Sequence, residues 1–461
     1  MVDIETVVGD LRDSFRSGSN RPVAKRLEQL ARLRALLVDN GAVVEAALAK
    51  DLGKNAAESQ LTEIGVVVAE IDHTVRHLRR WLRPHAVRTP LIVAPASSRV
   101  IREPLGVVLI IAPWNYPIQL TLVPLIGALA AGNTVVLKPS ELAPATSELL
   151  ATLIPVYLDP RVVAVVEGGV DETTRLLAER FDHIFYTGNG RVGRIVMSAA
   201  VAHLTPVTLE LGGKSPVYVD STVDLRVAAR RVAWGKFMNA GQTCVAPDYL
   251  LVESSVHARF VELLGEAVEE FYGRDPRESG SYGRIVNDAQ FDRLVGLLRD
   301  ENAAVGGGSD RDDRYIAPTV LVGVTTGSPS MREEIFGPIL PTIPVSGVEE
   351  AIRIINAGDK PLALYAFTSS KRARQKLLRE TSSGAVAFGI PSMHLLVDGL
   401  PFGGVGESGT GAYHGERSVA VFSHEKAVLD KPLKPDTAAL VYPPFSDRKY
   451  RLIRGLLARL R

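Results

Sequence analysis

One cysteine, Cys244, lies in the stretch NAGQTCVAPD (239–248), and the 461-residue chain contains no other. Free cysteine is often a small buried hydrophobic residue in a protein core. A thiol among small and polar residues can instead act as a nucleophile when its surroundings favour the thiolate. Other motifs of the chain have to decide between these two interpretations.

A glycine-rich stretch, TGNGRVGR, places Gly188, Gly190 and Gly193 in a G-x-G-x-x-G pattern. The apolar run HIFY precedes the glycines and the helix-like run RIVMSAAV follows them, which is the context in which this pattern binds a dinucleotide. The glycines allow the backbone to approach a phosphate, and the helix N-terminus attracts its negative charge. The stretch therefore predicts nucleotide binding.

The dinucleotide pattern also includes an acidic residue about 20 positions further on, which binds the ribose hydroxyls. Glu210, in PVTLELGGKSP, lies near that distance, but the glycine loop follows a late strand and not the first one. Glu141, in VLKPSEL, is the better ribose candidate, because Lys138 at the same strand end could bind ribose or phosphate. The alternative for this pair is an ordinary solvated loop.

The elements that must position these residues follow an alternating pattern from about residue 100. Short β-branched runs alternate with helical stretches, and the runs are GVVLIIAP, NTVVLKPS, VVAVVEGG and HIFYTGNG. Apolar strands that alternate with helices indicate a parallel, doubly wound sheet covered on both faces. Such a sheet binds ligands at the carboxyl ends of its strands.

A second α/β pattern begins after Gly213, with helices expected at 223–238, 255–272 and 286–300 and strands at TVLVGV and ALYAFTS. The proline-rich segment 84–101 is either a hairpin used in subunit contact or a plain connecting loop. We therefore predict a dinucleotide-binding domain at 1–83 and 102–212 and a catalytic domain at 213–412. An oligomerisation segment is expected at 84–101 and 413–430, and a tail at 431–461.

Composition excludes several classes of protein. Hydrophobic residues make up 46% and charged residues 23% of the chain, as in globular proteins of two or three domains. A net charge of +1 creates no field that would attract nucleic acid. One cysteine fits a reducing compartment, and the N-terminus lacks the features of a signal peptide, so we expect a cytoplasmic protein.

The C-terminal run RKYRLIRGLLARLR resembles a basic amphipathic helix. Apolar residues fall on one face and arginine and lysine residues surround them; the apolar residues are Leu452, Ile453, Leu456, Leu457 and Leu460, and the basic ones include Arg448, Lys449, Arg451, Arg454, Arg459 and Arg461. Such helices bind membrane surfaces peripherally. The alternative is a helix docked on its own subunit or on a partner.

Four stretches together resemble the aldehyde dehydrogenase superfamily: IAPWNYP (111–117), LELGGKSP (209–216), NAGQTCVAP (239–247) and EEIFGPILP (333–341). They occur in the order and at the separations of that family, and the resemblance covers about residues 5 to 445. KPLALYAF, LPFGGVGESGTGAYHG and the short N-terminus are most similar to the class 3 branch, which includes fatty and aromatic aldehyde dehydrogenases. The resemblance implies a Rossmann-type cofactor domain, an α/β catalytic domain, a small oligomerisation hairpin and a homodimer.

The resemblance implies three catalytic residues. The Cys244 thiolate would add to the aldehyde carbonyl and form a thiohemiacetal. The Asn115 side-chain amide and the Cys244 backbone N–H would hold the negative oxygen. Hydride transfer to nicotinamide would leave a thioester, and Glu210 would activate the water that hydrolyses it. Alone, Asn115 could be a turn residue before Pro117, and Glu210 could be a strand-end carboxylate.

The resemblance also implies the cofactor contacts, which are Trp114, Lys138, Glu141, Gly188, Gly193, Glu334 and Phe336. Glu334 would bind the nicotinamide ribose, and Phe336 would lie beside the nicotinamide ring. Glu141 would face the 2′-phosphate of NADP, so we expect NAD as the cofactor, with NADP possible. We assign no metal ligand.

The entrance to the substrate pocket departs from the family pattern. An asparagine-containing turn is usual there, whereas this chain has AFGIPSMH, and Phe388, Ile390 and Met393 make the wall more apolar. We therefore expect medium or long aliphatic or aromatic aldehydes as substrates. His394 receives no catalytic role.

Three rival functions can be compared with this interpretation. A coenzyme A-acylating relative would not need Glu210 as a deacylating base, and a non-catalytic relative would be expected to lack Cys244 or Glu210. A cysteine hydrolase would need a histidine partner near Cys244 and leaves the glycine loop unexplained.

Overall fold

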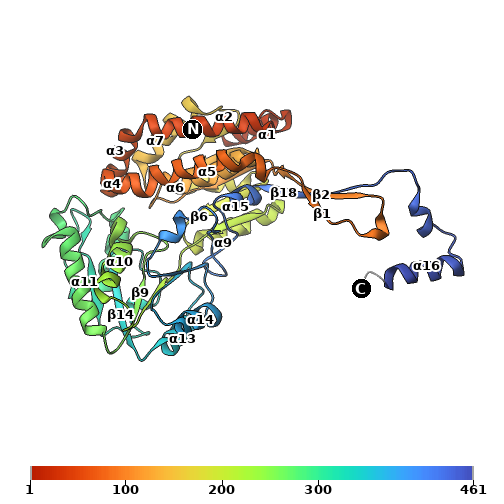
Figure 1. Ribbon diagram of the computed structural model, residues 1–461. Helices are drawn as coiled ribbons and strands as arrows, with labels where there is room; N and C mark the ends of the chain where they lie inside the picture. Colours follow the sequence, from red (N-terminus) through yellow and green to blue (C-terminus); the bar gives the residue numbers. More distant parts are fainter. Residues whose placement is uncertain (1–2, 459–461) are drawn as a thin grey trace.

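The computed structural model describes residues 3–458, which build two sheets and a projecting arm (Figure 1). The first sheet has the order β17-β7-β6-β3-β4-β5. Its strands are β3 (Val107–Ile111), β4 (Thr134–Lys138), β5 (Val163–Val165), β6 (His183–Thr187), β7 (Val207–Glu210) and β17 (Gly409–Thr410). All neighbours are parallel except β17, which runs antiparallel to β7. The parallel, doubly wound sheet predicted from the alternating runs is confirmed.

Both faces of this sheet are buried, because successive residues of β3 belong to different cores. Val108 and Ile110 pack in one core with α6 (Gln119–Ala131), whereas Val107 and Leu109 pack in the other with α1 (Ile4–Ser17). This explains why β3 has no polar alternation. The remaining helices of this half are α2 (Val23–Asp39), α3 (Gly41–Leu52), α4 (Ala56–Ser59), α5 (Gly65–Trp81), α7 (Pro144–Tyr157), α8 (Val170–Ala178) and α9 (Gly190–Ala200).

The second sheet has seven strands in the order β10-β13-β14-β9-β8-β15-β16, all parallel to their neighbours except β10. The strands are β8 (Pro216–Val219), β9 (Tyr249–Glu253), β10 (Asn302–Val305), β13 (Thr319–Val322), β14 (Ile339–Val345), β15 (Ala363–Phe367) and β16 (Ala385–Phe388). Its helices are α10 (Leu225–Phe237), α11 (His257–Tyr272), α12 (Asp288–Leu298), α13 (Val348–Ala357) and α14 (Lys371–Glu380). The second α/β pattern is thereby observed as a sheet of its own; the domain boundaries remain a prediction.

The arm consists of three antiparallel strands, β1 (His85–Val87), β2 (Ser97–Pro104) and β18 (Ser423–Asp430). Segment 84–101 is therefore a hairpin, and β18 pairs with β2 from Ser423 opposite Pro104 to Asp430 opposite Ser97. The short helix α15 (Glu416–Val421) leads from the first sheet into β18. Figure 1 shows the arm extending away from both sheets.

Beyond the arm, the chain continues to helix α16 (Asp447–Ala458), which lies away from the body of the molecule (Figure 1). Leu460, Arg459 and Arg461 of the predicted amphipathic helix lie outside the described residues. Within residues 3–458, no helix combines the length and the apolar composition that crossing a membrane requires.

Candidate active site

Cys244 lies on a loop between α10 and β9 whose backbone is held in an unusual conformation. Asn239, Ala240 and Gly241 have φ angles of 52°, 51° and 74°, which is the left-handed region. This conformation costs about 1–2 kcal/mol for an ordinary L-residue such as Ala240. At Gly241 a Cβ atom would lie 2.3 Å from the Gly337 carbonyl oxygen, so only glycine fits. Tertiary contacts must therefore hold this loop in place.

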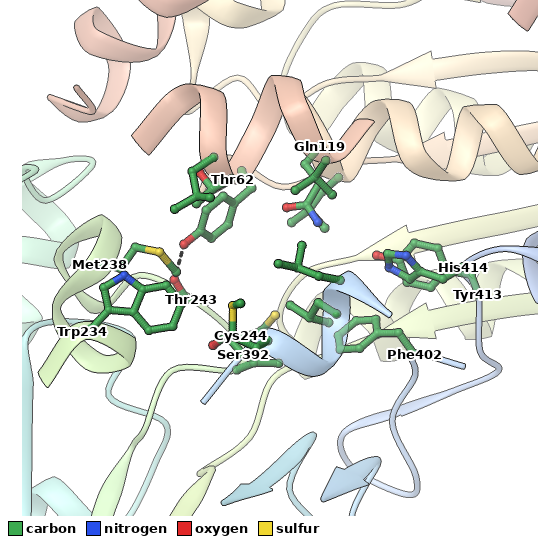
Figure 2. A pocket seen from close by; sticks show the side chains of 18 residues that line it. Thr62, Gln119, Trp234, Met238, Thr243, Cys244, Ser392, Phe402, Tyr413 and His414 are labelled. Atoms are coloured by element: carbon green, nitrogen blue, oxygen red, sulfur yellow. Dashed lines mark hydrogen bonds between the residues drawn. The ribbon is translucent and has the colours of Figure 1, made fainter. Parts of the chain in front are cut away.

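The loop delivers Cys244 to a pocket between the two sheets, shown in Figure 2. Most of the lining is apolar, and it comes from α5 and the turn before it, α6, α10 and the segment 392–414. The apolar lining residues are Leu61, Val66, Leu120, Trp234, Met238, Val245, Met393, Leu395, Leu396 and Phe402. Tyr413 and His414 lie together at one end (Figure 2). Near Cys244, the Tyr116 hydroxyl and Thr243 Oγ1 form a hydrogen bond of 2.7 Å.

Burial controls the protonation of Cys244. Removal from water, with the nearby Glu334 and Glu210 carboxylates, raises the pKa of the thiol to about 12. The thiol is consequently protonated at neutral pH, and its reaction as a nucleophile requires a group that takes the proton.

Glu210 is the last residue of β7, and its side chain is unusual among buried carboxylates. The residue is only 2% exposed, and neither carboxylate oxygen has a hydrogen-bond partner among the described residues. This burial raises the pKa of the carboxyl group well above its ordinary value. Its charge acts on Cys244 and on the hydroxyl of Tyr413, both of which line the pocket. An unsatisfied buried carboxylate costs stability, so a functional role is the better explanation.

Asn115 follows β3 and is held against the loop that carries Cys244. Its Nδ2 donates to the Gln242 carbonyl over 3.0 Å, and its own carbonyl accepts from Asn239 Nδ2 over 2.9 Å. A carboxamide nitrogen has two N–H donors, so the bond to Gln242 leaves one free to meet another acceptor. Asn115 is only 2% exposed, which keeps this donor away from bulk water.

The strand order of the first sheet creates a crevice next to these residues. β3 leads to β4 and β5 on one side, whereas β6 and β7 lie on its other side, so the order reverses between β3 and β6. Ligands of open α/β sheets bind at such a point. Trp114 follows β3 and the loop with Gly188 follows β6. Because β3 and β6 are neighbours in the sheet, a glycine loop that comes late in the sequence still lies next to the end of the first strand.

The crevice has the features that a dinucleotide needs. α9 begins directly after β6, and Asn189 caps it by accepting from the Val192 N–H. A Cβ at Gly188 would lie 2.3 Å from the Tyr186 hydroxyl, and one at Gly193 would lie 2.9 Å from Leu211. The buried Lys138 Nζ donates to the Pro139 carbonyl over 2.8 Å and to the half-exposed Glu141 over 3.2 Å. Cation, carboxylate and helix N-terminus therefore lie at the same edge of one sheet.

The segment EEIFGP closes the other side of the crevice. The Trp114 and Phe336 rings meet edge to face, with centroids 5.4 Å apart. Glu334 is half-buried, and its partial removal from water raises the pKa of its carboxyl group to about 8. A Cβ at Gly212 would lie 2.0 Å from this carboxylate. Asp248 anchors the segment: it accepts from the Ile335 N–H over 2.9 Å and pairs with Lys214.

The structure thus brings together the residues singled out in the sequence. Cys244 lines the pocket and lies close enough to Glu210 for the carboxylate to raise the pKa of its thiol, and Asn115 braces the loop that carries Cys244. Trp114 and Phe336 form one contact at the crevice, and the glycine loop and the Lys138–Glu141 pair follow neighbouring strands of the same sheet. The roles of these residues remain predictions.

The apolar wall of the pocket differs from the expectation. Met393 lines the pocket with Cys244, but Ile390 lines a neighbouring pocket that shares Trp234 and Met393. Phe388 lines neither, and its ring packs under the Arg374 guanidinium at 5.0 Å. The wall is instead built by helices α5, α6 and α10, whose apolar residues are indistinguishable in sequence from ordinary core positions.

Comparison with known proteins agrees with this geometry. The model of the aldehyde dehydrogenase family matches residues 2–428. The rat protein named "Aldehyde dehydrogenase, dimeric NADP-preferring" is 50% identical over 445 residues, which cover 96% of this chain and 98% of that protein. Human "Aldehyde dehydrogenase family 3 member B1" is 50% identical and covers 96% of this chain and 95% of its own.

Solved structures show the same architecture. The structure titled "Substrate bound state of Staphylococcus Aureus AldH" superposes with a TM-score of 0.96 at 44% identity, covering 99% of this chain and 100% of that one. A structure of indole-3-acetaldehyde dehydrogenase in complex with NAD+ has a TM-score of 0.84 at 28% identity and covers 93% of this chain and 89% of that one.

The burial of Glu210 predicts a pH-dependent effect of Glu210→Gln on stability. A carboxyl group whose pKa is raised by folding stabilises the folded state only while it is protonated, so wild-type stability falls as pH rises from the unfolded pKa through the folded one. The variant lacks this loss. As pH rises, the free energy of unfolding of the variant should therefore increase relative to that of wild type. The total increase is about 1.4 kcal/mol for each unit by which the pKa of Glu210 in the folded state exceeds that in the unfolded state.

Urea unfolding of both proteins between about pH 5 and 8 measures this gain. This range begins above the ordinary pKa of a carboxyl group, so the unfolded state is ionised there. Glu262→Gln, at an exposed position of α11, is the matched control and should show no such trend. A stability difference for Glu210→Gln that stays constant over this range would contradict the burial of an ionisable group here.

Proposed function

The chain belongs to the aldehyde dehydrogenase family and oxidises aldehydes to carboxylic acids with NAD or NADP, and from this premise we propose the roles of its site residues. Cys244 is the nucleophile, Asn115 stabilises the oxyanion and Glu210 is the base that activates water. None of the relatives' names points to a coenzyme A-acylating or a non-catalytic protein.

The first step joins the Cys244 sulfur to the aldehyde carbon. A carboxylate takes the thiol proton, the new S–C bond forms, and the carbonyl electron pair moves to oxygen. The carboxylates whose charges act on this thiol are those of Glu334 and Glu210. The free Nδ2–H of Asn115 and the Cys244 backbone N–H would hold the alkoxide, and one such donor typically contributes about 3–4 kcal/mol.

The second step completes the oxidation. A bound nicotinamide cofactor would supply the hydride acceptor, and loss of hydride from the tetrahedral carbon would leave a thioester on Cys244. Glu210 then takes a proton from water, whose oxygen attacks the thioester carbon. The S–C bond breaks, the proton on Glu210 passes to the sulfur and restores the Cys244 thiol, and the carboxylic acid is released. The proton taken from the thiol in the first step is lost to solvent before Glu210 acts on water.

The observation that carries this proposal is the unpartnered carboxylate of Glu210 beside Cys244. A buried carboxylate whose pKa is raised above its ordinary value is a stronger base than an exposed one, which suits a group that takes a proton from water. A structural role would predict a hydrogen-bonded side chain, which Glu210 lacks within residues 3–458.

Formation of NADH or NADPH with a panel of aldehydes tests the roles directly. Wild type should turn over, Cys244→Ala should form no reduced cofactor, and Glu210→Gln should give a single burst without turnover. Asn115→Ala should lower kcat by about 10²–10³-fold through loss of one oxyanion donor. Glu262→Gln should match wild type. Sustained turnover in Cys244→Ala would contradict the scheme.

We further propose that both cofactors bind, with residues Trp114, Lys138, Glu141, Gly188, Gly193, Glu334 and Phe336 around them. The negative charge of Glu141 disfavours the 2′-phosphate of NADP, but Lys138 lies 3.2 Å away and offsets it. The rat relative is NADP-preferring by name, and the indole-3-acetaldehyde enzyme is named as an NAD+ complex.

For the substrate, we propose medium or long aliphatic or aromatic aldehydes, because the pocket around Cys244 is mainly apolar. Burying one methylene contributes about 0.8 kcal/mol, so kcat/KM should rise roughly fourfold for each added carbon until the pocket is filled. Leu61→Ala should reduce this slope, whereas Leu91→Ala, at an exposed position of the arm, should not. A preference for acetaldehyde would contradict the proposal.

We also propose a cytoplasmic homodimer in which the arm contacts the partner subunit. β18 pairs antiparallel with β2, and the three strands of the arm project from the body of the molecule without a covering layer (Figure 1). The rat relative is dimeric by name. Peripheral membrane contact would come from α16, which exposes Leu452 and Leu457 beside Arg451 and Arg454.

Removal of residues 446–461 separates the two roles of the tail. If α16 binds membranes, flotation with anionic liposomes should recover the full chain and lose the truncated one, while both remain dimers in sedimentation. If α16 docks on the partner, truncation should weaken the dimer, and equal flotation of both proteins would remove the membrane proposal.

A further inference from the structure

Two fully buried charges, Lys54 and Glu63, lie beside the active site without a role in the reaction described above. Both side chains are 0% exposed, and Lys54 Nζ lies 2.7 Å from Glu63 Oε1. A buried ion pair rarely adds stability over a well-packed apolar pair of similar size. Stability alone therefore does not explain why two charges occupy this position.

Glu63 reaches the interior because of a local change in helix geometry. Gln60–Ile64 form a π-helical turn between α4 and α5, and such turns are frequent at functional sites. Within it, Leu61 and Thr62 line the substrate pocket while Glu63 is buried on the other side. A Cβ at Gly65 would lie 2.6 Å from the Gln60 carbonyl oxygen, so this geometry requires glycine after the turn.

Glu63 is bound by three groups at once. Oε1 faces Lys54, and Oε2 accepts from the N–H groups of Ile118 and Gln119 over 3.1 and 2.9 Å. These amides belong to the N-terminal end of α6, where a negative charge is stabilised. The carboxylate therefore fixes Lys54 relative to the segment that follows Asn115.

Lys54 then contacts the backbone of the proposed oxyanion residue. Its Nζ donates to the Asn115 carbonyl over 3.3 Å and lies 4.1 Å above the ring of Tyr116. Tyr116 in turn bonds Thr243, the residue before the nucleophile (Figure 2). One ammonium group thus holds both Asn115 and Tyr116 in place.

The same carbonyl joins this cluster to the strained nucleophile loop. Asn239 Nδ2 donates to the Asn115 carbonyl and, over 3.2 Å, to the Gln242 carbonyl. Glu58 Oε1 accepts from the Asn239 N–H over 2.9 Å, so a second carboxylate of the N-terminal segment supports the left-handed backbone at 239–240. Three distant segments, 54–63, 115–119 and 239–243, are therefore joined through the Asn115 carbonyl.

We propose that Lys54 and Glu63 are positioning residues that orient the Asn115 side-chain amide toward the substrate oxygen. This inference rests on the proposed function of Asn115. It requires that the ion pair act through Asn115, because Lys54 bonds the Asn115 backbone and neither Lys54 nor Glu63 lines the pocket.

A double-mutant cycle tests this dependence. Lys54→Met should lower kcat about 10- to 100-fold with less than about a threefold change in the KM of either substrate, as expected for an interaction that acts mainly in the transition state. In the Asn115→Ala background, the same substitution should change kcat less than about twofold, because the side-chain amide that the ion pair orients is absent. Lys50→Met, at an exposed position of α3, is the matched control and should match wild type.

The outcomes separate this inference from the proposed function. Equal losses of kcat from Lys54→Met in both backgrounds would indicate a merely structural role and overturn it. A wild-type kcat in Asn115→Ala would refute the oxyanion role itself. If Lys54→Met does not fold, Lys54→Met with Glu63→Gln removes both charges and keeps an acceptor for the α6 amides; the cycle is then run with this pair, with the same expectations.

Discussion

The limited contact of the reacting groups with water is the constraint on which the active site depends, since Glu210 and Asn115 are buried and Cys244 is half-buried. It raises the pKa of the Cys244 thiol to about 12, which keeps the thiol protonated at neutral pH, and it raises the pKa of the Glu210 carboxyl group above its ordinary value. Neutral groups can be kept in an apolar pocket at moderate cost, whereas a free thiolate and a free carboxylate together would be costly. Negative charge on the substrate oxygen then develops only when substrate and proton acceptor are in place. Oriented hydrogen-bond donors stabilise such a developing charge most effectively.

The fold satisfies this constraint by bringing the carboxyl ends of strands from one sheet to face a loop of the other. β3 leads to Trp114 and Asn115, β6 leads to the glycine loop, and β7 ends at Glu210. The loop with Cys244 comes from between α10 and β9 of the second sheet. Its left-handed residues are unfavourable on their own, so the buried polar contacts of Asn115, Asn239 and Glu58 have to hold it.

Much of this arrangement could be predicted from sequence, because chemistry and local structure coincide at the motifs. Cys244, Glu210 and Asn115 lie in motifs that together resemble one family, although Asn115 and Glu210 alone had ordinary structural alternatives. Apolar strand runs revealed the first sheet. Glu210 also shows how a spacing rule can mislead: its distance from the glycines suits a ribose ligand, but it is the buried last residue of β7, and its carboxylate raises the pKa of the Cys244 thiol.

Other parts could not be predicted, since they depend on contacts between distant segments. Nothing local marks Lys54 and Glu63, which resemble surface residues of a helix until the π-helical turn and the packing of α6 bury them. The pocket wall was misassigned for the same reason: Phe388 is apolar in sequence but packs against Arg374, whereas Trp234 and Met238 resemble core residues of α10. Side-chain direction at a loop depends on the whole fold.

The most direct test of the central claim is the mass of Glu210→Gln after it is mixed with an aldehyde and NAD. If Cys244 captures the substrate and Glu210 serves the later hydrolysis, the protein should gain the mass of the aldehyde less two hydrogens, located on the peptide with Cys244, and only when NAD is present. Reduced cofactor formed without any adduct, or an adduct on another residue, would contradict covalent catalysis by Cys244 with Glu210 as the deacylating base.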